Sequence, residues 1–156
     1  MSGLIETKLA EIGLSLPEPA APVAAYVPAV EQNGFLHISG QLPFDENGDL
    51  MVGRLGEDRD IAFGEQAARA CGVMLVAQMK AALGDLDRVE RVVKLGVFVN
   101  SASNFTDQAQ VANGASELMQ EVFGDPGRHA RSAVATPVLP LGVAVEIDAI
   151  VAVSDG

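Results

Sequence analysis

Three charged side chains stand inside two apolar, β-branched runs near the end of the chain. The run ARSAVAT carries Arg131 as its second residue, and the run VAVEIDAI carries Glu146 and Asp148. The break PVLPLG separates the two runs. A guanidinium is a planar, two-pronged receptor for a carboxylate. A carboxylate beside it could hold or activate a water molecule. One interpretation of these residue types is a site that binds a small carboxylate and holds a water molecule beside it.

The two runs read as strands of one hairpin. If they pair about Val138 and Leu139, Arg131 lies opposite Glu146. A slip of one residue would place Arg131 against Ile147 instead, so the register is a testable prediction. A structural ion pair between Arg131 and Glu146, possible at a subunit interface, explains the same pattern. The residues alone leave both interpretations open.

Five further elements precede this hairpin. Apolar spacing predicts a short helix over residues 2–12, and a Pro-rich linker follows it to about residue 20. A hairpin is expected over residues 23–43, with Asn33-Gly34 as a type I′ turn. A long helix runs from about Asp60 to Leu83, an apolar strand covers RVERVVKLGVFVN, and Asn104 caps a helix of roughly residues 105–123.

The element order ββαβαββ, after the short helix, predicts an α+β domain over residues 1–156. We expect a single sheet with two helices packed on one face. No predicted helix remains to cover the other face of the sheet, yet its strands are too apolar for that face to be exposed to solvent. Self-association through the sheet follows as an expectation.

Composition narrows the function classes. The net charge of -11 and the sequence pI near 4.4 disfavour nucleic acid and anionic membranes as partners. Metal binding is not indicated, because Cys71 is the one cysteine and the two histidines, His37 and His129, lie far apart. His129 stands two residues before Arg131 and could donate to a ligand, but a loop histidine near the start of a strand is more often incidental. With no secretory or transit signal in the sequence, a cytoplasmic location is expected.

The motifs ARSAV and LPLGVAVEIDAI, preceded by HISGQLP and GVFVN, resemble the Rid family, also called YjgF-like and often labelled endoribonuclease L-PSP. The resemblance extends from about Tyr26 to Val153, and the N-terminal helix resembles a longer branch of the family. It implies a chorismate-mutase-like fold and a homotrimer with clefts between subunits. It also implies hydrolysis of amino-acid-derived enamines or imines to 2-oxo acids and ammonia, without metal or organic cofactor.

Several positions of this chain match the family's site. The resemblance implies that Arg131 binds the substrate carboxylate and that Glu146 positions water. At the position two after the arginine, where the family often has Cys, this chain has Ala133; the residue is expected to act through its backbone, and thiol chemistry there is excluded. The remaining residues implied to bind substrate are Tyr26, Gly40, Gln41 and Asn113.

Three functions stay open at this level: an imine or enamine deaminase, a protein that binds a 2-oxo acid or related carboxylate without turning it over, and the ribonuclease of the old label. The acidic charge and the lack of a His/Lys acid–base pair disfavour the ribonuclease.

Overall fold

The computed structural model describes residues 3–19, 21–22 and 24–156. Residues 1, 2 and 20 of the predicted N-terminal helix and linker, and residue 23 of the predicted hairpin, lie outside this description. The helices, strands and short 3-10 turns (η) are, in chain order, α1 (Leu4–Glu11), β1 (Ala29–Gln32), β2 (Phe35–Gln41), α2 (Ile61–Leu83), η1 (Leu86–Arg88), β3 (Val89–Asn100), α3 (Gln108–Phe123), η2 (Asp125–Gly127), β4 (Ala130–Thr136), η3 (Pro140–Gly142) and β5 (Val145–Val153).

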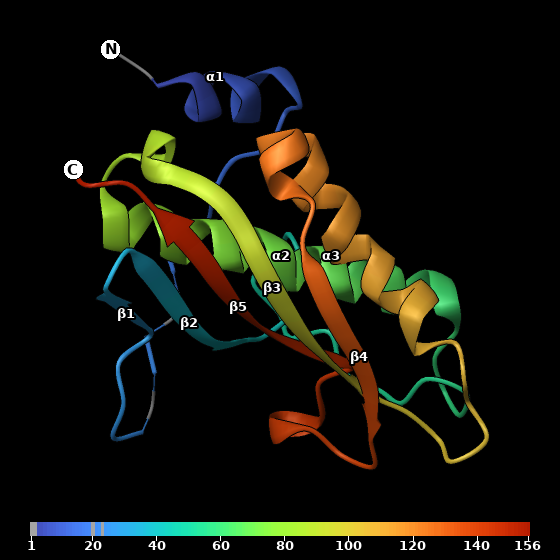
Figure 1. Cartoon of the computed structure of the whole chain (residues 1–156). Helices are drawn as coiled ribbons and strands as arrows, with labels where there is room; N and C mark the ends of the chain where they lie inside the picture. Colours follow the sequence, from blue (N-terminus) through green and yellow to red (C-terminus); the bar gives the residue numbers. More distant parts are fainter. Residues whose placement is uncertain (1–2, 20, 23) are drawn as a thin grey trace.

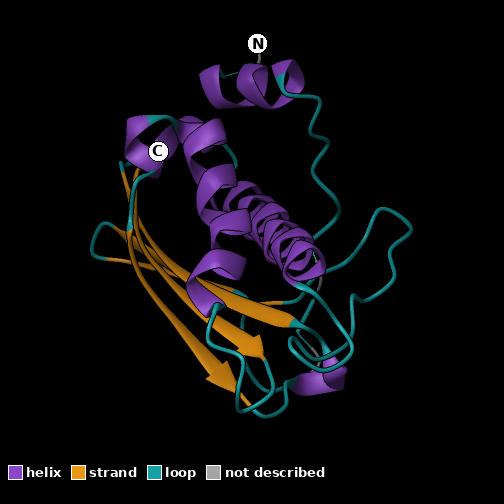
Figure 2. Ribbon diagram, turned by 90° about the vertical axis from the view of Figure 1, so that its right-hand side faces the viewer, coloured by secondary structure: helices purple, strands orange, loops and turns teal. Residues whose placement is uncertain are grey.

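The described strands form one five-stranded sheet in the order β1-β2-β5-β3-β4. β3 and β4 run parallel, and the other neighbours are antiparallel (Figure 1). This is the predicted α+β fold with the predicted order of elements. The helix count on the covered face differs from the prediction, because α1 joins α2 and α3 there and contacts α3 and η1. Figure 2 shows the helices gathered on one side of the strands.

Local signals fix most of the element ends. Asn33 and Gly34 have φ values of 53° and 81°, which a type I′ turn requires, so the predicted first hairpin is confirmed. The Asp60 carboxylate accepts a hydrogen bond from the Phe63 N–H at 2.9 Å and caps α2. Gly84 ends α2 with a φ of 76°.

The predicted start of α3 is wrong. The helix begins at Gln108, and Asn104 does not cap it. The Phe105 N–H donates to the Ala102 carbonyl at 3.0 Å, which closes a turn around Asn104 before the helix begins. The chain therefore enters the helix about one turn later than the sequence pattern indicated.

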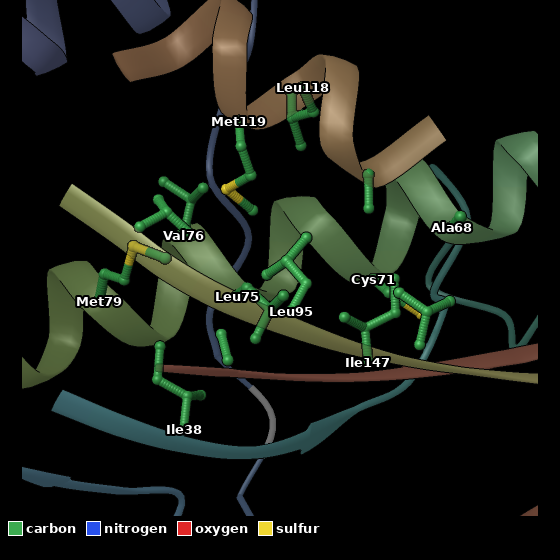
Figure 3. Close-up of a cluster of buried hydrophobic side chains, with 14 of the residues drawn as sticks. Ile38, Ala68, Cys71, Leu75, Val76, Met79, Leu95, Leu118, Met119 and Ile147 are labelled. Carbon is green, nitrogen blue, oxygen red and sulfur yellow. The ribbon is translucent and has the colours of Figure 1, made fainter. Parts of the chain in front are cut away.

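The hydrophobic core lies between the sheet and the helices. On β5 the side chains alternate strictly, with Ile147, Ala149 and Val151 buried and the residues between them partly exposed. Figure 3 shows Ile147 and Leu95 of the sheet meeting Cys71 and Leu75 of α2, with Leu118 and Met119 of α3 beyond. One face of the sheet is thus sealed by helices.

The opposite face of the sheet, called the open face below, faces away from that helix layer (Figure 2). It presents the large apolar side chains of Val30, Phe35 and Val134, each more than two fifths exposed. The partly exposed Glu146 and Asp148 of β5 lie on it as well. In the described part of the chain, no helix combines the length and apolar character needed to cross a bilayer.

Candidate functional site

The last two strands do not pair with each other, so the predicted hairpin between them is wrong. β4 pairs with β3, placing Arg131 beside Leu95, and β5 pairs with the other edge of β3, placing Glu146 beside Phe98. Helix α3 is the reason, because a strand–helix–strand connection makes β4 parallel to β3. β4 therefore takes the edge of the sheet, and β5 returns between β2 and β3.

This topology puts the predicted pair on opposite faces. Arg131 lies on the helix face, where its guanidinium reaches residues of α3. Glu146 lies on the open face, where the alternation of β5 directs it. The two side chains therefore make no ion pair within the chain, and each belongs to a separate cluster. We call these the arginine half-site and the glutamate half-site.

The arginine half-site holds its cation with neutral acceptors. Arg131 Nη1 donates to Asn113 Oδ1 at 2.8 Å and to Ser116 Oγ at 3.0 Å, and Nη2 donates to the Ala109 carbonyl at 3.1 Å. None of the ion pairs found among the described residues involves Arg131. The guanidinium is partly buried and keeps its full charge available to an incoming anion.

Two residues of this half-site were missed as site residues by the sequence analysis. Ser116 Oγ lies 2.8 Å from His129 Nε2, and His129 Nδ1 lies 2.7 Å from the Gly127 carbonyl oxygen. Spacing offered a signal for both. Ser116 is three residues after Asn113 on one helix, so the two share a face; His129 precedes Arg131 by two residues at the start of an extended strand.

Ala133 lies on the same strand face as Arg131, beside Val97 of β3, and packs partly buried against the core. Its methyl group leaves the edge of β4 uncrowded next to the guanidinium. Asn113, in the first half of α3, contacts Arg131 directly, and Ala133 follows Arg131 on the same face of β4.

The glutamate half-site depends on glycines. A Cβ atom on Gly40 would come within 2.7 Å of Glu146 Oε1, so the bare backbone of β2 makes room for this carboxylate. Gly96 of β3 gives Asp148 room in the same way. Burial, and then the negative charge of Asp148, raise the pKa of Glu146. Burial also raises the pKa of Asp148, against the opposing hydrogen bond from Gly96 and the charge of Lys94.

Tyr26 lies on the segment that runs beside Gly40. Ser39 ties this segment to β2, since its Oγ donates to the Val27 carbonyl at 3.0 Å and its N–H to the Pro28 carbonyl at 2.9 Å. Tyr26 is 53% exposed. The structure thus brings Gly40 and Glu146 together on the open face, and Tyr26 stands next to the residues that bond to Ser39.

The side chain of Gln41 points away from this region. It is buried, its Oε1 accepts from Gln78 Nε2 at 3.1 Å, and its own Nε2 donates to the Ser39 carbonyl at 3.0 Å. A β-bulge between Ile38 and Gln41 turns it toward α2. A role for Gln41 in binding would therefore have to use its backbone.

A groove on the described surface lies away from both half-sites. It has a volume of about 940 Å³ and is bounded by residues 14–18, the loop around Phe44 to Met51, and α2. Neither half-site lines it. Among the described residues, no group of three or more His, Cys, Asp or Glu side chains is arranged to hold a metal ion.

Comparisons with known proteins add a family and several relatives. A family model described as "YjgF/chorismate mutase-like, putative endoribonuclease" matches residues 6–151. Protein TCP17 of Trypanosoma cruzi is 54% identical over 151 residues, which cover 96% of this chain and 94% of that protein.

Solved structures show the same fold. Protein Atu1372 of Agrobacterium tumefaciens, described as of unknown function, superimposes with a TM-score of 0.89 at 46% identity, covering 96% of this chain and 92% of that one. RidA from the Antarctic bacterium Psychrobacter sp. superimposes with a TM-score of 0.62 at 29% identity, covering 87% of this chain and 94% of that one.

Proposed function

Because the chain belongs to the YjgF/chorismate mutase-like family, we propose that it hydrolyses amino-acid-derived imines or enamines to 2-oxo acids and ammonia. The family assignment confirms the resemblance read from the sequence motifs. One observation carries the proposal: Arg131 is a partly buried cation that uncharged acceptors hold in place and no described carboxylate neutralises. Such a group is suited to binding a substrate carboxylate.

Arg131 is the substrate anchor in this proposal. A guanidinium has five N–H donors, and the bonds to Asn113, Ser116 and Ala109 use three of them. The Nε hydrogen and one hydrogen on Nη2 then serve the substrate. Fixing the carboxylate also fixes the adjacent C=N carbon, so most of the catalytic advantage comes from orientation.

Water completes the reaction without a metal or organic cofactor. The oxygen of a water held by Glu146 attacks the imine carbon, and its proton passes to the carboxylate. The carboxylate returns that proton to the nitrogen, which gives a neutral tetrahedral carbinolamine. The hydroxyl proton of the carbinolamine then passes by way of the carboxylate to the nitrogen, the C–N bond breaks and ammonia leaves, and the carbon becomes the carbonyl of the 2-oxo acid. A carboxylate with a raised pKa accepts and returns a proton near neutral pH more readily than an ordinary one. We place this reaction in the cytoplasm.

In this proposal, a second copy of the chain brings a Glu146 close to Arg131. Within one chain Arg131 and Glu146 lie on opposite faces of the sheet, so the proposed site forms between subunits of a homotrimer. The open face of one subunit would bring Glu146, Gly40 and Tyr26 to Arg131 of its neighbour. The exposed apolar side chains of that face, Val30, Phe35 and Val134, support such burial.

An ammonia-release assay tests this proposal. An amino acid oxidase generates 2-iminopropanoate in situ, and we expect the protein to accelerate its hydrolysis. Arg131→Ala should reduce kcat/KM by at least about 100-fold, because a charged, bidentate anchor is lost. Arg128→Ala is the matched control, since it removes a neighbouring, exposed guanidinium.

Equal turnover by the Arg131→Ala and Arg128→Ala variants would contradict the role of Arg131. Incubation of the protein with RNA at several salt concentrations tests the endoribonuclease activity named in the family description. We expect it to stay intact, because a chain with a net charge of -11 repels a phosphate backbone.

Binding without turnover is the second candidate, and the topology favours it in one respect. Within one chain the arginine half-site can bind a carboxylate by itself, whereas the proposed hydrolysis also needs the glutamate half-site of another copy. A protein that sensed or buffered 2-oxo acids would need the first alone. Saturable binding of 2-oxobutanoate by calorimetry, together with an unaccelerated imine hydrolysis, would select this function.

A further inference from the structure

His129 and Ser116 form a directional hydrogen-bond network behind Arg131. A backbone carbonyl can only accept, so the 2.7 Å contact between His129 Nδ1 and the Gly127 oxygen places the proton on Nδ1. In the neutral ring Nε2 is then an acceptor, and the Ser116 hydroxyl at 2.8 Å donates to it. A lone pair of Ser116 Oγ is left to accept from Arg131 Nη1 at 3.0 Å.

Burial and charge keep this network in its neutral state. Ser116 is 8% exposed and His129 is half-buried. Burial, and to a smaller degree the positive charge of Arg131, lower the pKa of His129, while the bond to Gly127 acts in the opposite direction. His129 therefore stays uncharged at neutral pH and keeps Nε2 free to accept.

Other charged groups stand on the surrounding elements. Arg91 of β3 pairs with Asp125 of η2, and Glu121 of α3 pairs with Arg69. Arg128 and Glu117 are exposed. Arg131 is the charge that acts on the His129 ring.

A serine beside a histidine could also be a nucleophile and its base. Two features oppose that interpretation here. Ser116 Oγ is buried beneath the guanidinium, and it already accepts a hydrogen bond from Arg131. An attacking oxygen needs an open path to its electrophile, which this position does not provide.

We propose that His129 is a positioning residue for carboxylate recognition: through Ser116 it fixes the Arg131 guanidinium in the orientation that binds the ligand. This inference rests on the proposed role of Arg131 as the carboxylate receptor. Without the His129 acceptor, the Ser116 hydroxyl is free to rotate, and its lone pair no longer faces Nη1. The guanidinium then samples several orientations, and binding must select one of them.

Binding of 2-oxobutanoate to three variants tests the inference. His129→Ala should weaken binding about five- to tenfold, roughly the effect of losing one hydrogen bond. His129→Gln keeps an acceptor near the position of Nε2 and should restore binding to within about threefold of the natural chain. Arg128→Ala, next to His129, should bind as the natural chain does. Equal affinity of the His129→Ala variant and the natural chain would overturn the proposal.

Nitrogen-15 NMR of the ligand-free protein tests the network independently of ligand binding. We expect the Nδ1–H tautomer for His129, and a rise in its pKa in Arg131→Ala, since a neighbouring positive charge is removed. An Nε2–H tautomer, or a pKa unchanged by Arg131→Ala, would overturn the network. If the natural chain binds no 2-oxo acid, the proposed function fails while these spectra still decide the network. Covalent labelling of Ser116 by phenylmethanesulfonyl fluoride would show a nucleophile instead.

Discussion

The two half-sites lie on opposite faces of one sheet and accommodate charges of opposite sign in different ways. On the helix face, Arg131 is surrounded by an amide oxygen, a hydroxyl and a carbonyl, so its charge is oriented without being neutralised. On the open face, Glu146 and Asp148 lie over the bare backbone of Gly40 and Gly96, and their pKa values are raised. The cation is held by hydrogen bonds, whereas the carboxylates are given space.

Under the proposed function, this arrangement gives up stability for a site. An unneutralised cation and two neighbouring carboxylates in partly buried positions are unfavourable in a fold judged by packing alone. Such groups are common where chemistry occurs. The sheet keeps the opposite charges apart within the chain, which prevents them from neutralising each other.

Glu146→Gln should separate the two half-sites by function. Loss of the carboxylate removes the base, so kcat for 2-iminopropanoate should fall roughly 100-fold or more. Affinity for 2-oxobutanoate should change by less than about threefold, because Arg131 still binds the carboxylate. Steady-state kinetics and calorimetry on the same preparation measure both. Equal losses in kcat and affinity would remove the water-positioning role.

Gly40→Ala should disturb the glutamate half-site by crowding alone. The new methyl group would meet the end of the flexible Glu146 side chain, which must move, so kcat should fall by about tenfold while the fold persists. The same substitution made in Glu146→Gln serves as the control. If Gly40 acts through Glu146, the double variant should be no slower than Glu146→Gln; independent losses would show another cause.

A smaller effect concerns stability and pH. The folded-state pKa of Glu146 is raised, so its ionisation destabilises the fold at neutral pH and not below about pH 4, where the carboxyl is protonated in both states. Glu146→Gln should therefore raise Tm at pH 7. This gain in Tm should shrink as the pH is lowered and vanish below about pH 4. A variant less stable than the natural chain at pH 7 would show that Glu146 has a stabilising partner.

Signals between near neighbours in the sequence predicted most of the fold. The Asn33-Gly34 turn and the long helix behind Asp60 depend on a few adjacent residues, and both appear where expected. The family motifs likewise led to Arg131 and Asn113, which are in contact.

The pairing of strands that are distant in the sequence could not be predicted from the sequence. Val138 and Leu139 look like the centre of a hairpin, yet the partner of β4 is decided by the preceding helix α3, and β5 pairs with strands distant in sequence. The alternation on each strand was correct, but it does not say which strand lies alongside. The contact between His129 and Ser116 was missed for the same reason, because the two residues belong to different elements.

Mixed assemblies test most directly the claim that Arg131 and Glu146 act together from different copies. Co-expressed Arg131→Ala and Glu146→Gln chains carry different affinity tags, and purification over both tags isolates mixed forms of the proposed homotrimer. A ring of three containing both kinds of chain has one cleft with both natural residues, so we predict about one third of the natural imine hydrolysis rate. Mixed trimers as inactive as either parent would contradict a site shared between subunits.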